Sequence, residues 1–200
     1  MGLLYFSPIL IKHIKKCVPM KSPFSFTYNL VETGRGKGLF KINDQIMEFE
    51  TTQASNPLRD LLQAMVTIIQ SPSHLWDEKN NAVVEWYCDK CLLLIDISSP
   101  DGKTIHLNLT YTSGPFEEEV ATTNASCILP LKSFYLAIIK ELDQLIKQKG
   151  LLNYTQIWQK DEFPLTFFLI LKKYLINWKE WKLGIMDSDI LESEFTMILA

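Results

Sequence analysis

The chain has 200 residues, of which 47% are hydrophobic and 22% are charged, and its formal net charge is −3. This composition suffices for one domain with a substantial core. Only two of the 20 basic residues are arginine, the side chain that most often reads phosphates and guanine. The composition therefore disfavours a nucleic-acid partner.

The N-terminal residues lack the pattern of a secretory leader. An apolar stretch at 3–11 precedes a basic cluster at 12–16, whereas a signal peptide carries its basic residues first. No apolar run reaches the roughly 18 residues that a membrane span needs, so we expect no membrane contact and a cytoplasmic location. We predict an N-terminal extension without fixed structure at 1–19, or a true start at Met20, and one α+β domain over 20–200.

The four cysteines are too few for a disulfide scaffold, so we expect reduced thiols. Cys88 and Cys91 have half of the spacing of a zinc ribbon, but no second such pair and no paired histidines follow. We therefore expect no metal site and no cofactor.

The first predicted elements are a strand and a hairpin. Apolar residues alternate with polar ones over 24–30, which predicts a strand with one buried face. The glycines at 34, 36 and 38 should then form a flexible loop. Segments 39–42 and 46–50 flank Asn43-Asp44, so a second turn is expected between two strands.

The first helix should begin at Asn56-Pro57, with Asn56 as N-cap and Pro57 in the first helical position. Apolar residues at helical spacing follow and should lie on the sheet. They are Leu58, Leu61, Leu62, Met65, Ile68 and Ile69. Ser71-Pro72 should end this helix, and 74–78 should add a short edge strand.

The clearest pattern is a three-stranded meander over 82–111. Apolar residues alternate on both sides of Asp89-Lys90, and a two-residue turn there places Trp86 opposite Leu93 and the two cysteines opposite each other. All residues on that face are apolar, so it should be the buried face of the sheet.

The second turn of the meander, at 99–103, contains Pro100 and Gly102 and suits a three-residue loop closed by a bulge. That loop predicts Ile97 opposite Ile105. It also predicts Asp96 directly across from His106 on the other face.

Beyond the meander, a long polar connection is expected at 112–127. A helix is predicted from Pro130 to a Gly150 cap, followed by a short helical turn at 154–158. A third helix is expected at 165–178, apolar on most of its surface and hence buried, and an edge strand at 195–199. The predicted fold is α+β, with an antiparallel meander sheet of about six strands packed against three to four helices.

Several short motifs accompany this order of elements. They are the first strand with its glycine-rich continuation, Asn56-Pro57-Leu58 with Leu61-Leu62, Trp76-Asp77-Glu78, Tyr154 with Trp158, and Phe163-Pro164. Over about 24–178 the chain resembles small bacterial α+β proteins associated with the immunity proteins of polymorphic toxin systems. The resemblance implies a cytosolic protein that binds and neutralises a toxin and has no catalytic residues.

The meander face opposite the core is not purely polar. It carries Val83, Tyr87, Leu92 and Leu94 beside Glu85 and Asp96. Such a face is covered either by a helix of the same domain or by a partner protein, for which aromatic residues rimmed by acids are suited.

The candidate partner-binding residues are Tyr87, Leu92, Leu94, Asp77, Glu78, Glu117, Glu118 and Glu119. An acidic run such as 117–119 is usually a solvated loop, but it also steers basic partners such as nuclease toxins.

The leading hypothesis is a non-enzymatic cytosolic protein-binding domain, an immunity protein that occludes a toxin surface; a structural or regulatory interaction module is its near neighbour. The alternative is an enzyme or small-molecule binder with a site near Asp96 and His106, because an Asp–His pair can orient a general base. The same two residues also fit a solvated cross-strand pair.

Overall fold

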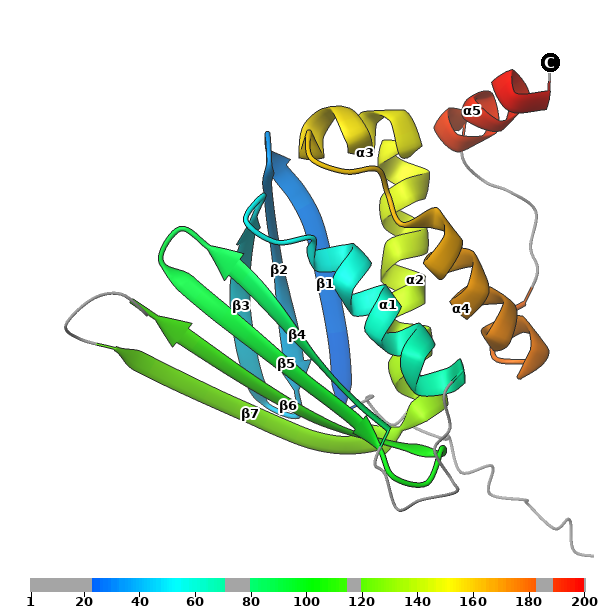
Figure 1. Ribbon diagram of the computed structural model, residues 1–200. Helices are drawn as coiled ribbons and strands as arrows, with labels where there is room; N and C mark the ends of the chain where they lie inside the picture. The colour runs from blue at the N-terminus through cyan, green and yellow to red at the C-terminus, as the bar shows by residue number, and fades with distance from the viewer. Residues whose placement is uncertain (1–22, 71–79, 115–119, 183–188, 200) are drawn as a thin grey trace, which may run out of the picture.

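The computed structural model describes residues 23–70, 80–114, 120–182 and 189–199. In these residues the elements are β1 (Phe24–Glu32), β2 (Arg35–Ile42), β3 (Gln45–Thr52), α1 (Pro57–Gln70), β4 (Asn80–Cys88), β5 (Cys91–Ser99), β6 (Thr104–Ser113), β7 (Ala121–Pro130), α2 (Leu131–Lys149), α3 (Leu151–Trp158), α4 (Leu165–Asn177) and α5 (Asp189–Leu199). The α+β class predicted from the sequence is confirmed (Figure 1).

The strands form two antiparallel sheets instead of one. Sheet A has the order β1-β2-β3 and sheet B the order β4-β5-β6-β7, so the predicted single meander of about six strands is wrong. Helix α1 separates the two sheets in the sequence. They approach each other where Thr52 donates to the carbonyl of Tyr87 (3.2 Å) and Arg35 pairs with Asp89 (2.5 Å).

The core fills the space between the sheets and under the helices. Trp86 of sheet B is fully buried, and its ring lies within 6.5 Å of four aromatic rings of sheet A. These are Phe26, Tyr28, Phe40 and Phe49. Aromatic rings at such separations add directional attraction to the hydrophobic gain, so this cluster joins the two sheets.

The helices gather on one side of the molecule, while the far ends of β6 and β7 extend away from them (Figure 1). Helix α1 lies along β4, α2 lies along β1, and α4 packs on both helices. The apolar stripe predicted for α1 is buried as expected, apart from a partly buried Ile69.

Helix α1 begins at Pro57 as predicted, but Asn56 does not cap it through its side chain. Its Oδ1 is buried without a hydrogen-bond partner in the described part of the chain. The carboxylate of Asp60 instead accepts from the Asn56 amide (3.2 Å), a bond like the second half of a capping box but made from one position further along the helix.

The expected loop of glycines is mostly strand. Only Gly34 lies in the turn, with φ at +67°, whereas Gly36 and Gly38 belong to β2. A Cβ on Gly36 would lie 2.3 Å from the hydroxyl of Tyr28, and one on Gly38 would lie 2.1 Å from the carbonyl oxygen of Thr27. These glycines are therefore required by close packing inside the sheet, a common reason for glycine in a strand.

The predicted register between β4 and β5 is confirmed, with Trp86 opposite Leu93 and Cys88 opposite Cys91. These two cysteines form a disulfide, so the expectation of reduced thiols is wrong for them. Cys127 is a free thiol, and burial raises its pKa.

The predicted register between β5 and β6 is wrong by two residues, since Ile97 lies opposite Leu107. The cause is Asp101, whose carboxylate accepts from the amides of Lys103 (2.9 Å) and Thr104 (2.7 Å) and widens the loop. A shift of two keeps each side chain on its predicted face.

Three predictions for the C-terminal half need correction. The polar connection contains strand β7, and 195–199 lies in helix α5 instead of an edge strand. Helix α4 is buried along one side only, through Phe168, Leu171 and Leu175. The predicted edge strand at 74–78 lies outside the described residues. None of the helices that the described residues form has the length and apolarity of a membrane span.

Candidate functional site: the outer face of sheet B

The candidate site is the side of sheet B that faces away from the core, here called the outer face. Strand alternation and register arrange its side chains in rows across the sheet. From one end to the other the rows are Tyr87-Leu92-Thr112-Thr122, Glu85-Leu94-Thr110-Asn124, Val83-Asp96-Asn108-Ser126 and Asn81-Ser98-His106-Ile128. Tyr87, Leu92 and Leu94, the described members of the predicted partner site, are therefore neighbours.

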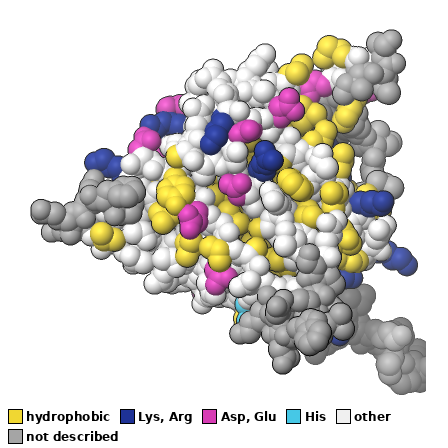
Figure 2. Space-filling model, in the orientation of Figure 1, with side chains coloured by type: hydrophobic (Ala, Val, Ile, Leu, Met, Phe, Trp, Pro, Cys, Tyr) yellow, Lys and Arg dark blue, Asp and Glu magenta, His cyan; other side chains and the backbone are white. Residues whose placement is uncertain are grey.

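No described helix lies over these rows, because α1 flanks the edge strand β4 and α2 lies along β1 of sheet A. Leu92 and Leu94 are half-buried, and Val83 is 55% exposed. Figure 2 shows hydrophobic and acidic side chains intermixed where the sheet faces the viewer. The face was expected to be covered either by a helix of the same domain or by a partner protein, and among the described residues no helix covers it.

The charge on the outer face is negative. Glu85 and Asp96 are its only ionised side chains at outward positions of β4–β7, and no Lys or Arg stands there. The Tyr87 hydroxyl donates to Glu85 (2.5 Å), and this hydrogen bond raises the pKa of Tyr87. The site thus offers aromatic and aliphatic surface with carboxylates held beside it.

A groove of about 590 Å³ continues this surface between α1 and β4. We call it the α1–β4 groove; its walls include Ser55, Asp60, Gln63, Thr67, Val83, Glu85 and Tyr87 and no basic residue. Burial raises the pKa of Asp60, the acid on its helical wall. The groove and the outer face share Val83, Glu85 and Tyr87, so they form one continuous acidic and apolar surface.

The alternative site around Asp96 and His106 does not have the predicted geometry. Asp96 lies opposite Asn108, whose side-chain amide donates to it (3.4 Å), and His106 lies opposite Ser98. Neither Asp96 nor His106 lines the α1–β4 groove or the cavities of about 740, 600 and 290 Å³ that other described residues form. No three His, Cys, Asp or Glu side chains gather as a metal site in the described ranges.

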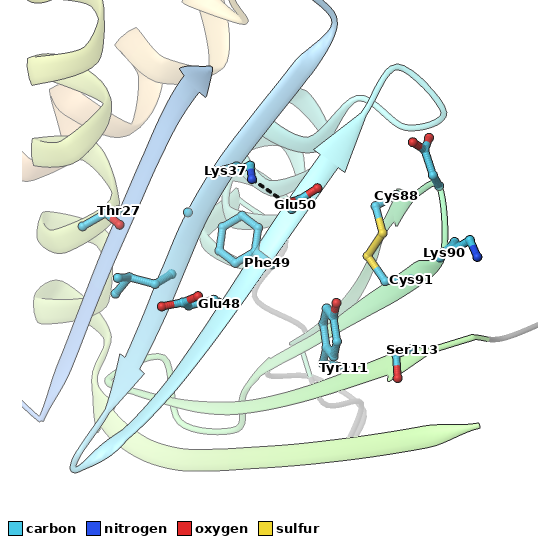
Figure 3. A pocket seen from close by; sticks show the side chains of 13 residues that line it. Thr27, Lys37, Glu48, Phe49, Glu50, Cys88, Lys90, Cys91, Tyr111 and Ser113 are labelled. Atoms are coloured by element: carbon cyan, nitrogen blue, oxygen red, sulfur yellow. Dashed lines mark ion pairs between the residues drawn. A yellow bond between two sulfur atoms is a disulfide. The ribbon is translucent and has the colours of Figure 1, made fainter. Parts of the chain in front are cut away.

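A second hollow, which was not predicted from the sequence, lies where the two sheets diverge. This cavity of about 740 Å³ has Phe49 and Tyr111 on its walls, the Lys37–Glu50 ion pair (2.6 Å) on one side and the Cys88–Cys91 disulfide on the other (Figure 3). Gly38 also lines it. No local sequence pattern marks this cavity, because its walls come from strands of both sheets.

The remaining predicted site residues, Glu117, Glu118, Glu119, Asp77 and Glu78, lie outside the described residues. Glu119 precedes β7 in the sequence by one residue, Val120.

Comparison with known proteins adds no functional assignment: no protein-family model, curated protein or solved structure matches this chain.

Proposed function

We propose that this chain is a protein-binding domain whose partner docks on the outer face of sheet B and in the α1–β4 groove. The observation that carries the proposal is the composition of that surface. Half-exposed Tyr87, Leu92 and Leu94 stand beside Glu85 and Asp96, and no outward position of β4–β7 holds a Lys or Arg. Aromatic anchors with an acidic surround are typical of interfaces for basic proteins.

The partner proposed on these grounds is a basic protein. In line with the resemblance to immunity proteins, we propose a toxin that is neutralised because its active surface is covered. This mechanism requires no catalytic group on the present chain. Glu117, Glu118 and Glu119 add three negative charges to the chain and would raise the association rate with such a partner.

The test starts with the tagged full chain as bait in the cells that make it, and includes the product of the gene next to its own. A captured protein is then purified and titrated by calorimetry at increasing salt. We expect a basic partner whose affinity falls as salt rises, because exposed charge pairs are screened.

Charge reversal separates this surface from general electrostatic attraction. Glu85→Lys with Asp96→Lys should weaken binding about tenfold or more, equivalent to about 1.4 kcal/mol. Asp44→Lys with Glu48→Lys is the matched control, since both are exposed carboxylates of the β2–β3 hairpin of sheet A and their reversal changes the net charge by the same amount. Equal weakening by the control, or no weakening by the outer-face variant, would reject the outer face as the binding site.

A further inference from the structure

The edges of the sheets differ in how they are covered. Helix α2 lies along β1, where the Glu141 carboxylate accepts from the Tyr28 amide (3.2 Å). Strand β4 is flanked by α1, and Ser55 accepts from the Tyr87 amide (3.2 Å). Strand β7 pairs with β6 on one side, and within the described residues its other side makes no backbone hydrogen bond. It is therefore an open edge of sheet B.

Strand β7 also lacks the features that normally keep an edge single. Its ten residues, Ala121–Pro130, contain no charged side chain, and the only proline is the last residue. Its register with β6 runs without a bulge from Ser113–Ala121 to Thr104–Pro130. Natural edges are blunted by lysine, proline or bulges because an unpaired strand attracts another strand. An unprotected edge of this length is typical of a strand that is paired in its working state.

We propose that β7 pairs with β7 of a second copy of this chain, antiparallel about a two-fold axis, so that two four-stranded sheets join into one continuous sheet. A two-fold interface is the commonest form of association between identical chains. It places each residue near its own counterpart, so like charges would repel, and β7 has none. This proposal is independent of the proposed binding of a basic protein.

The register of the pairing follows from the sheet. In the joined sheet, core-facing residues of one β7 must lie opposite core-facing residues of the other. This holds when the two-fold axis passes through a residue near the middle of the strand, Ala125 or Ser126. An axis midway between these two would pair core-facing with outward-facing residues and is excluded. Centring on Ala125 leaves Pro130, which cannot donate a ladder hydrogen bond, outside the paired region. It sets Asn124 opposite the second copy's Ser126 and Thr123 opposite the second copy's Cys127.

The first test is the molar mass of the full chain by analytical ultracentrifugation from micromolar to submillimolar concentration. We expect a monomer–dimer equilibrium. Asn124→Lys with Ser126→Lys brings like charges together across the axis and should raise the dimer dissociation constant about tenfold or more. The matched control is Asn108→Lys with Thr110→Lys, one strand further in on the same face, and it should leave dimerisation unchanged.

A crosslink tests the register independently of charge. Thr123→Cys should form an intermolecular disulfide with the second copy's Cys127 under mild oxidation, whereas Thr122→Cys, which points to the other face, should not. A chain that is monomeric at every concentration overturns the proposal, even if a strand of another protein is later found to pair with β7. A dimer that tolerates the β7 lysines and forms no Thr123→Cys crosslink overturns it as well.

Discussion

Helix α5 is held by a carboxylate that can be removed without touching the rest of the fold. Glu194 is 8% exposed, and its two oxygens accept from the first amides of α3, those of Leu151 (2.6 Å) and Leu152 (2.9 Å). Gly150 makes room for it, since a Cβ there would lie 2.5 Å from Glu194 Oε1. The perturbation is Glu194→Ala.

The expected cost can be estimated from these contacts. The substitution leaves two amides at a helix N-terminus without an acceptor and removes a negative charge from the positive end of the helix dipole. Hydrogen bonds to charged groups and dipole interactions of this kind together contribute about 2–4 kcal/mol. Because Glu194 is the residue that joins α5 to these amides, we expect the loss to appear as release of α5, with the sheets intact.

The assay is amide hydrogen exchange of the full chain measured by NMR. Glu194→Ala should speed exchange at Leu151 and Leu152 by about thirtyfold or more, which corresponds to about 2 kcal/mol. Glu194→Gln keeps one good acceptor and should give a smaller change. Glu192→Ala, an exposed acid on the same helix, is the control. Unchanged exchange at both amides in Glu194→Ala would refute the assigned role of the carboxylate.

Three further predictions concern the sheets and their turn. Trp86→Ala should lower the free energy of unfolding in urea by about 3–5 kcal/mol. Trp86→Phe should lower it by less than about 1.5 kcal/mol, because the indole nitrogen that it removes is buried without a partner in the described residues. Equal losses in the two variants would contradict this reasoning. Gly38→Ala should lower the free energy of unfolding by about 1–3 kcal/mol in the same assay, since the added Cβ would lie 2.1 Å from the Thr27 carbonyl oxygen. An unchanged urea midpoint would show that β1 and β2 can move apart at this point without cost. Hydrogen bonds from the Thr104 and Lys103 amides lower the pKa of Asp101 from 3.8 to about 2. Ionised Asp101 therefore stabilises the fold above pH 3.8, and this contribution is lost as the pH falls through about 2. Asp101→Asn should therefore flatten the acid limb of a stability–pH curve, and an unaltered limb would count against these hydrogen bonds.

The parts of the fold that could be predicted are those in which one side of an element is buried. The β4–β5 hairpin was predicted to the residue because a two-residue turn and an all-apolar face leave one register. The starts of α1 and α2 followed from Pro57 and Pro130. In each case the signal lies within a short stretch of sequence.

The errors arose where distant residues decide the structure. Strand β7 buries only Ala125 and Leu129, so no alternation marks it, and its pairing with β6 makes it a strand. The segment 195–199 lies in α5, and the contact that joins this helix to α3, from Glu194 to the amides of Leu151 and Leu152, spans more than 40 positions of sequence. The cavity between the two sheets is lined by residues of both sheets, so no single stretch of sequence marks it.

The candidate site was predicted in part. Tyr87, Leu92 and Leu94 share the outer face as the alternation required, and the two-residue shift of β6 did not move any side chain to the other face. That same shift removed the Asp96–His106 pair. The α1–β4 groove was not predictable, because it depends on how a helix lies beside a strand distant in sequence.

The position of α2 along β1 has a consequence for synthesis of the chain. Glu141, which accepts from the Tyr28 amide, is made 113 positions after its partner. At ordinary translation rates this interval is on the order of ten seconds. For most of it, once Thr52 has been made, the first sheet is complete in sequence, yet the side that α2 will cover is bare. Apolar surface left uncovered for that time is prone to aggregation, so the nascent chain is most vulnerable between the synthesis of β3 and that of α2.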